Sequence, residues 1–306
     1  MNAAIRAVVR CGSANGFSVV GVERGYYGLI RGHFKEFSPA TIDDILHRGG
    51  TVLRSARAEE FRTVEGRRQA IEEMRKADIA ALVVIGGDGS LAGALELSRM
   101  GVTTVGIPAT IDNDIAGTDV SIGFDTAVNT VIKAVNQLRD TAYSHDRVYV
   151  VEVMGRNSGY IALYSGLAVG AEAILIPEMP VDLDEVCERL DKAHQSGKAH
   201  SIVIVAEGVG GTPQAARRPD ESAAFRVASY ISENTRHEVR VTILGHLQRG
   251  GSPTAGDRLL ASRLGEAAVR LLVRGISGRM TALQADRIVD IPIEEALANS
   301  KPINRD

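Results

Sequence analysis

The residues most capable of chemistry begin with a glycine-rich turn. The segment GGDGS, residues 86–90, follows the apolar run Ala81–Ile85 and precedes a helical pattern. Glycines let the backbone approach a phosphate closely, and a helix N-terminus supplies free N–H donors. Asp88 adds a carboxylate suited to Mg²⁺. The context favours phosphate binding, although a tight strand-to-helix turn capped by an aspartate is the alternative.

A second acidic loop, TIDND at residues 110–114, comes shortly after the apolar run Val102–Ile107. Asp112 and Asp114 are costly to desolvate together unless a cation or a proton transfer uses them. One carboxylate can face Mg²⁺ while the other accepts a proton from an attacking hydroxyl. Alone, the loop fits a polar turn held by Asx hydrogen bonds equally well. Because the glycine-rich turn follows the preceding predicted strand, the two motifs together favour phosphoryl transfer over a simple polar turn.

Arginines at the ends of predicted strands form a third group. Arg147 and Arg240 open two strands, while Arg156 and Arg249 follow two strands in glycine-containing segments. Arginine is suited to bidentate phosphate contacts, whereas each arginine alone could be a solvated surface charge. Arg147, Arg156 and Arg240 stand at the ends of core strands, and three arginines in such places favour anion binding.

Two further polar residues follow predicted strands. Glu207 could receive sugar hydroxyls or could be a solvated strand end. His246 could be a general base, but we favour a hydrogen-bonding role for it, because no Ser or Cys nucleophile stands in a recognisable motif. The sequence contains no His/Cys pattern typical of a metal site.

The elements that must position these residues are short apolar strands alternating with amphipathic helices. This alternation predicts βαβ units and parallel sheets covered on both faces, with ligands beyond the carboxyl ends of the strands. The expected strands are Ala81–Ile85, Val102–Ile107, Arg147–Val153, Ile174–Ile176, Ser201–Val205 and Val239–Leu244. The expected helices are Val64–Lys76, Leu91–Met100, Asp125–Arg139, Leu183–Gln195, Ala223–Asn234 and Ala255–Arg274. The chain opens directly as a helix, whereas the first element of a doubly wound fold is usually a strand.

Length and composition limit the class of protein. The 306 residues suggest about two domains. The net charge is 35 − 38 = −3, which implies no broad basic surface for nucleic acid. Cys11 and Cys187 form neither a disulfide framework nor a CxxC site, which fits a reducing cytoplasm. No apolar run reaches the roughly 18 residues that span a bilayer, so we expect no membrane association.

The motifs GGDGS, TIDND, MGR (154–156) and HLQRGGSP (246–253), in this order and spacing, resemble those of bacterial-type ATP-dependent 6-phosphofructokinases. The resemblance covers essentially the whole chain. It implies an α/β fold with two doubly wound parallel-sheet domains: residues 1–123 plus 248–298 for the nucleotide, and residues 124–247 plus 299–306 for the sugar phosphate. It implies a cytoplasmic, allosteric homotetramer with composite sites. That enzyme transfers the γ-phosphoryl group of MgATP to the 1-hydroxyl of fructose 6-phosphate, the committed step of glycolysis.

The same resemblance implies roles for individual residues. Asp112 resembles the base on the 1-hydroxyl, and Thr110 and Arg156 resemble the groups that stabilise the transferring phosphoryl. Asp88 and Asp114 resemble the carboxylates on the Mg²⁺ side. The positions that match the nucleotide site are Tyr26, Arg57, Gly87, Asp88, Gly89, Ser90 and Gly93. Those that match the sugar-phosphate site are Thr110, Asp112, Met154, Gly155, Arg156, Glu207, His246 and Arg249, with Arg147 and Arg240 reaching the 6-phosphate from a neighbouring subunit. Those that match an effector site are Arg6, Arg10, Arg139, Glu172 and Lys198.

The sequence departs from the family pattern in three places. The family normally has a strand and a GGDAPG turn before the segment MNAAIR, so we expect that a first strand is missing. A start assigned too late is the favoured explanation, and a real truncation that lacks a core strand is the alternative. Ala109 stands where ATP users usually have Gly and pyrophosphate users usually have Lys, while Gly89 matches the ATP type. Pro39 and Ser196 replace basic residues of the effector site, which weakens the expectation of ADP activation and phosphoenolpyruvate inhibition. Two alternatives stay open: a pyrophosphate-dependent version of the transfer, and a catalytically silent sugar-phosphate-binding or regulatory subunit.

Overall fold

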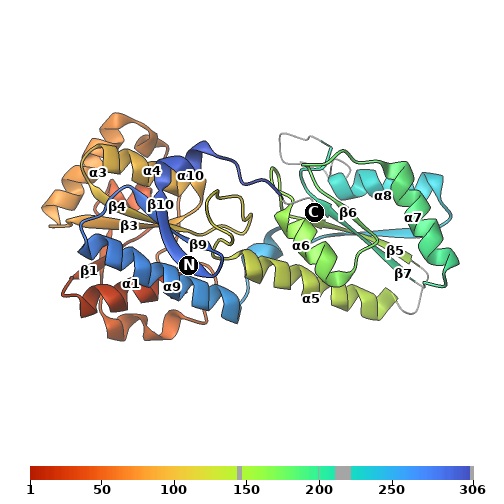
Figure 1. Ribbon diagram of the computed structural model, residues 1–306, viewed down its shortest axis with the longest axis horizontal. Coiled ribbons are helices and arrows are strands. Elements are labelled where there is room, and N and C mark those ends of the chain that lie inside the picture. The colour runs from red at the N-terminus through yellow and green to blue at the C-terminus, as the bar shows by residue number, and fades with distance from the viewer. Residues whose placement is uncertain (143–146, 199, 211–221, 304–306) are drawn as a thin grey trace. The chain divides into compact units, whose positions relative to one another are not determined.

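Helices and strands alternate along most of the chain, as the sequence pattern predicts (Figure 1). The computed structural model describes residues 1–142, 147–198, 200–210 and 222–303. None of the helices in this part of the chain combines the length and the apolarity needed to cross a membrane. The chain divides into a first unit (Met1–Thr110, Ile115–Gly123 and Ser252–Lys301) and a second unit (Ile111–Asp114, Phe124–Gly251 and Pro302–Asp306). That the first unit binds nucleotide and the second binds sugar phosphate stays a prediction.

The first unit is built on a four-stranded mixed sheet in the order β10-β9-β4-β3. β3 and β4 are parallel with Gly86 opposite Pro108, β9 is parallel to β4, and β10 is antiparallel to β9. A separate antiparallel pair is formed by β1 and β2. The strands are β1 (Val19–Val22), β2 (Phe34–Phe37), β3 (Ala81–Gly86), β4 (Thr103–Pro108), β9 (Arg279–Gln284) and β10 (Arg287–Pro292).

Helices cover both faces of the four-stranded sheet (Figure 1). On one face, Ile107 of β4 packs in one cluster with Leu264 of α9 and Ala4 of α1, and all three are fully buried. On the other face, α4 and α10 pack against β3 and β9. Each fully buried leucine or isoleucine contributes about 1.5–3 kcal/mol through the hydrophobic effect. The helical segments are α1 (Asn2–Ala14), α2 (Tyr26–Leu29), η1 (Pro39–Ile45), η2 (Glu59–Arg62), α3 (Val64–Lys76), α4 (Asp88–Arg99), α9 (Ala255–Val273) and α10 (Ile293–Ala298).

β3 is less buried than its apolar sequence predicts. Its side chains from Ala81 to Val83 and that of Ile85 are only half-buried, whereas Val105 and Ile107 of β4 have no exposed area. Among the described residues β3 pairs with β4 alone, so it is an edge strand of this sheet. The apolar run identified a strand correctly, but it could not distinguish an edge strand from a central one.

The second unit contains a parallel sheet in the order β6-β7-β5-β8. The two central strands are buried almost throughout, as expected for parallel strands covered on both faces. Figure 1 shows α5 and α6 on one side of this sheet, and α7 and α8 on the other. The strands are β5 (Arg147–Val153), β6 (Ala173–Leu175), β7 (His200–Ala206) and β8 (Glu238–Ile243). The helical segments are α5 (Phe124–Ala142), α6 (Tyr160–Val169), α7 (Leu183–Gln195), α8 (Ala223–Asn234) and η4 (Gly245–Arg249).

Candidate active site

The glycine-rich turn connects β3 to α4 in the first unit. α4 begins at Asp88, and its N-cap residue Gly87 has no side chain with which to cap the first turn. A Cβ added at Gly86 would lie 2.4 Å from the hydroxyl oxygen of Ser90, whereas one added at Gly89 would meet no atom within 4 Å. The helix N-terminus and the open space at Gly89 together suit an anion that approaches the backbone.

The loop after β4 lies beside this turn. The Ala109 amide donates a hydrogen bond to the Gly86 carbonyl at 2.9 Å, and a Cβ at Gly87 would lie 3.6 Å from the Cβ of Thr110. The Thr110 carbonyl in turn accepts a hydrogen bond from the Ser121 hydroxyl at 2.7 Å. The structure therefore brings Gly87 and Thr110 together, as the order of the strands predicts.

Tyr26 supports α4 from the side. Its ring stacks on Phe61 with centroids 4.0 Å apart, and its hydroxyl donates to the Ser90 carbonyl at 2.5 Å. A Cβ at Gly93 would lie 2.5 Å from the Tyr26 ring, so glycine is required there for the ring to pack. Burial raises the pKa of the Tyr26 hydroxyl, which stays protonated and able to donate. Arg57, the remaining residue of the predicted nucleotide site, is exposed.

In the second unit, the acidic loop is anchored over the end of β5. The Ser158 hydroxyl donates to the backbone carbonyl of Asp112 at 2.8 Å. Asn113 is almost fully buried and has a positive φ of 52°, a region that asparagine tolerates better than most residues. Asp112 and Asp114 on either side of it are half-buried. Ser158 was not among the residues predicted from the sequence, because a contact over 46 positions leaves no local pattern.

The ends of β5 and β7 pack backbone against backbone. The Gly208 amide donates to the Gly155 carbonyl at 3.1 Å, and the Glu207 amide donates to the Val153 carbonyl at 2.9 Å. A Cβ at Gly208 would lie only 1.9 Å from the Arg156 carbonyl oxygen. This close approach holds Arg156, which is exposed, and Glu207, which is half-buried, at neighbouring strand ends.

Gln248 ties the segment after β8 to the same edge. Its side-chain oxygen accepts from the Met154 amide at 3.2 Å, and its side-chain nitrogen donates to the Gly245 carbonyl at 3.1 Å. Gln248 is 1% exposed, whereas His246 and Arg249 on the same short helix are exposed. The carboxyl edge of the second sheet thus gathers most of the predicted sugar-phosphate residues. Gln248 is a positioning residue that the sequence motif contained but did not distinguish.

Arg147 and Arg240 lie elsewhere in the second unit. Arg147 is the first residue of β5, so a rise of about 3.3 Å per residue puts it about 20 Å from Val153 at the carboxyl end. Its Nε donates to Oε2 of Glu238 at 2.9 Å, and Arg240 pairs with Oε1 of the same carboxylate. The hydrogen bond to Glu238 is the main cause that raises the pKa of Arg147. Within one chain, the structure does not bring Arg147 to the residues at the carboxyl edge.

The predicted effector residues fall into two sets. In the first unit, Arg10 Nη1 lies 3.0 Å from Asp43 Oδ1, and Arg6 Nη2 lies 3.7 Å from the same oxygen. In the second unit, Lys198 forms an ion pair with Glu172. Arg139 in that unit donates to the Val169 carbonyl, the last residue of α6. Arg6 and Arg10 thus share one carboxylate in the first unit, and an effector function for either set stays a prediction.

A metal would have to be held by few protein ligands. Across the described ranges, no group of three or more His, Cys, Asp or Glu side chains is arranged to hold an ion. Mg²⁺ in phosphoryl-transfer sites takes one or two carboxylates plus water and substrate phosphates. The exposed carboxylate of Asp88 and the half-buried one of Asp114 fit that donor set by their chemistry.

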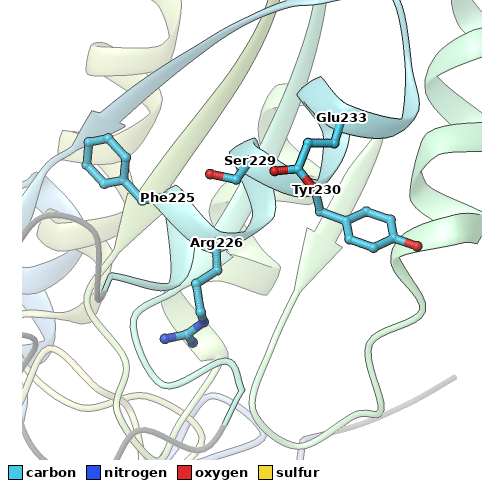
Figure 2. Close-up of a pocket in the computed structure, with 5 residues that line it drawn as sticks. All are labelled: Phe225, Arg226, Ser229, Tyr230 and Glu233. Carbon is cyan, nitrogen blue, oxygen red and sulfur yellow. The ribbon is translucent and has the colours of Figure 1, made fainter.

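A hollow of about 360 Å³ runs along α8 (Figure 2). Its lining consists of Phe225, Arg226, Ser229, Tyr230 and Glu233, none of them a predicted site residue. Figure 2 shows Arg226 and Tyr230 leaving the helix in different directions. Arg226 donates to the Val209 carbonyl at 2.6 Å, and Tyr230 donates to Asp184 at 2.5 Å. These contacts fasten α8 to its neighbours and give the hollow no evident chemistry.

Known proteins resemble this chain along its length. A sequence model of one family, described as Phosphofructokinase, matches residues 1–272. The ATP-dependent 6-phosphofructokinase of Halothermothrix orenii is 53% identical over 307 residues, covering 100% of this chain and 92% of that protein. The protein of the same name from Clostridium botulinum (strain Hall) is 52% identical over 306 residues, with the same coverage.

Solved structures agree with this chain in fold. The phosphofructokinase of Pichia pastoris in the T-state superposes with a TM-score of 0.89 at 35% identity. That match covers 97% of this chain and 36% of the Pichia chain, so this chain spans about a third of the longer protein. A pyrophosphate-dependent phosphofructokinase from Marinobacter aquaeolei superposes with a TM-score of 0.84 over 99% of this chain and 82% of its own. At 24% identity, the latter likeness concerns the fold alone.

Proposed function

The chain belongs to the phosphofructokinase family, and from this premise we propose that it phosphorylates fructose 6-phosphate at its 1-hydroxyl with ATP. It is a phosphotransferase of glycolysis, and its product is fructose 1,6-bisphosphate. The observation that carries this conclusion is 53% identity over the whole chain to a curated ATP-dependent 6-phosphofructokinase. The resemblance drawn from four separate motifs points the same way.

We infer that the first unit receives the phosphates of ATP at the glycine-rich turn. The N-cap residue of α4, Gly87, has no side chain, and an added Cβ at Gly89 would meet open space. Phosphate oxygens can therefore approach the first-turn amides closely. Thr110 lies beside Gly87, where its hydroxyl can donate to the phosphoryl group that is transferred. Tyr26 holds Ser90 and so fixes the first turn of the helix.

Asp112 is the base that we assign to the 1-hydroxyl. Its backbone is fastened to Ser158, which limits the positions its carboxylate can take. A positioned general base contributes typically about 10²–10⁴-fold to a rate. Arg156 at the end of β5 is an exposed cation that can neutralise charge on the transferring phosphoryl group. This division of work fits phosphoryl transfer, which depends on positioning and charge neutralisation more than on covalent catalysis.

The carboxyl edge of the second sheet suits the sugar. Glu207 offers carboxylate oxygens to sugar hydroxyls, and His246 is exposed and can hydrogen-bond the substrate. Arg249 is an exposed guanidinium suited to a phosphate ester. Met154 and Gly155 form the strand end against which the sugar would lie, held in place by Gln248.

Magnesium is the metal that we propose for the reaction. Asp88 and Asp114 would hold it, directly or through water, together with the phosphates of ATP. When bound, Mg²⁺ neutralises charge on the β- and γ-phosphate oxygens.

A homotetramer with composite sites is part of the proposal. Arg147 lies about 20 Å along β5 from the carboxyl edge of its own sheet, so it can serve a sugar phosphate held by another copy more readily than one held by its own chain. α6 also exposes apolar area, with Tyr164 49% and Leu167 68% exposed, as a helix at a subunit interface would. We place this enzyme in the cytoplasm, and we propose the basic residues Arg6, Arg10, Arg139 and Lys198, with Glu172, as its effector site.

A coupled assay with each donor tests the proposal. We expect turnover of fructose 6-phosphate with ATP and little or none with pyrophosphate, because Ala109 is small and uncharged and Gly89 leaves space for a nucleotide. Turnover with pyrophosphate alone would establish the pyrophosphate-dependent reaction instead. Binding of fructose 6-phosphate without turnover with either donor would establish a catalytically silent subunit.

A further inference from the structure

A carboxylate stands between the two arginines at the amino end of the second sheet. Glu238 begins β8, and the strand register pairs it with Arg147, the first residue of β5. Arg240 lies two residues further along β8 and therefore on the same face as Glu238. Arg147 donates to one carboxylate oxygen at 2.9 Å, and Arg240 pairs with the other. Two guanidinium groups thus converge on one oxyanion.

The three side chains are accessible enough to exchange partners. Arg147, Glu238 and Arg240 have side chains that are 24%, 45% and 56% exposed. Ion pairs with this exposure are weak and are screened by salt, so an incoming anion can replace the carboxylate. Carboxylate and phosphate oxygens accept the same charge-assisted hydrogen bonds from arginine. Glu238 therefore marks where an oxygen of a phosphate group would sit between the guanidinium groups.

We propose that Glu238 is a resident counter-ion of the Arg147–Arg240 pair, which competes for the two guanidinium groups with any incoming phosphate group, that of the sugar substrate or free inorganic phosphate. The inference rests on the proposed function, in which this pair receives the 6-phosphate of fructose 6-phosphate held by another copy. With Glu238 in place, the cluster carries a net charge of +1 rather than +2. Displacing Glu238 costs the same free energy whichever phosphate group enters, so Glu238 weakens the binding of both ligands by a similar factor. Glu238 thus sets the affinity of the arginine pair for phosphate groups and does not take part in the transfer itself.

Glu238→Gln tests this role, because it keeps the size of the side chain and removes its charge. The matched control is Glu185→Gln on α7, which removes the same charge from another exposed carboxylate of this unit that pairs with an arginine, Arg189. The probes are inorganic phosphate in a calorimetric titration and fructose 6-phosphate in steady-state kinetics. In Glu238→Gln we expect the Kd for phosphate to fall about two- to thirtyfold, the range for losing two exposed ion pairs. The KM for fructose 6-phosphate should fall by a similar factor, with kcat unchanged.

Two further variants separate the possible outcomes. Glu238→Asp keeps the charge, so its Kd for phosphate should stay closer to that of the parent than that of Glu238→Gln. In Arg240→Ala the KM for fructose 6-phosphate should rise, which tests the proposed function of the pair independently of Glu238. If Glu238→Gln binds phosphate no better than the Glu185→Gln control, or binds it more weakly, the competitor role is wrong. A wild type without phosphoryl transfer would contradict the proposed function, yet the phosphate titration would still decide the role of Glu238.

Discussion

The proposal that Arg147 and Arg240 serve the active site of another chain can be tested by mixing two chains that are each impaired. Asp112→Asn removes the proposed base from the chain that carries it, and Arg240→Ala removes a phosphate contact from the chain that lends it. If every site combines two chains, a site is intact when Asp112 comes from the second variant and Arg240 comes from the first. With equal amounts and random assembly, each requirement is met in about half of the sites, so about one quarter of them are intact.

The assay is a coupled measurement of turnover on hybrids purified through two different affinity tags. Asp112→Asn alone should retain about 1% of the parent kcat or less, since a general base typically contributes 10²-fold or more. The assay uses a fructose 6-phosphate concentration well below the raised KM of Arg240→Ala, so that this variant also turns over slowly. Against this low background, recovery to about one quarter of the wild-type rate per chain is easily measured, given the random assembly of a symmetric oligomer.

The matched control for this experiment pairs Asp112→Asn with Arg156→Ala. Both residues lie in the loops at the carboxyl edge of one sheet, so each site takes both from a single chain. Every site in these hybrids therefore carries one of the two defects, and activity should not recover. Hybrids of Asp112→Asn with Arg240→Ala that show only the summed activity of their parents would refute the composite site. They would then place the whole reaction within one chain.

Two substitutions test the geometry of the loops. Ala109→Lys adds a cation and four methylenes beside the glycine-rich turn, where the Ala109 amide donates a hydrogen bond to the Gly86 carbonyl. This variant should raise the KM for ATP at least severalfold. Unchanged ATP kinetics would mean that Ala109 does not face the phosphoryl donor. Gly208→Ala places a Cβ 1.9 Å from the Arg156 carbonyl, and overpacking of this kind typically costs about 1–3 kcal/mol, so kcat and melting temperature should both fall. Gly250→Ala is its control, because its Cβ would make only an ordinary contact at 3.7 Å, and equal losses in the two variants would remove the packing argument.

The parallel core could be predicted because its strands carry a local signature. The run RVYVVEV gave β5 with its observed bounds, Arg147–Val153, since a parallel strand buried on both faces is apolar throughout. Amphipathic periodicity gave α3 and α7 equally well. Both kinds of element are determined by neighbours within a few positions in the sequence.

Other elements lack such a signature. The hairpin of β9 and β10 turns at Ala285 and Asp286, which have positive φ values of 46° and 61°, and this dipeptide is not one that predicts a two-residue turn. α6 is apolar on nearly every side and shows no amphipathic stripe from which a helix could be recognised. In both cases the tertiary packing overrides a weak local preference.

In the candidate site, too, some features have a local sequence signature and others depend on contacts between distant segments. Its motifs indicated which residues follow the strands, and the shared edge of a parallel sheet explains why they lie near one another. The contacts that hold them could not be predicted, because Ser158 meets Asp112 over 46 positions and Gln248 meets Met154 over 94. The pairing of Glu238 with Arg147 depends on the register between β5 and β8, which no single segment determines.

The most direct test of the account is whether the labelled γ-phosphate of ATP moves to fructose 6-phosphate in the wild type and in Asp112→Asn. We expect the wild type to yield fructose 1,6-bisphosphate carrying the label at its 1-position. Asp112→Asn should bind fructose 6-phosphate with little change in affinity but transfer the label about 10²-fold more slowly or slower still, since it keeps the shape of the side chain and loses its basicity. Transfer by the variant within a few-fold of the wild-type rate, or no transfer by the wild type, would contradict the account.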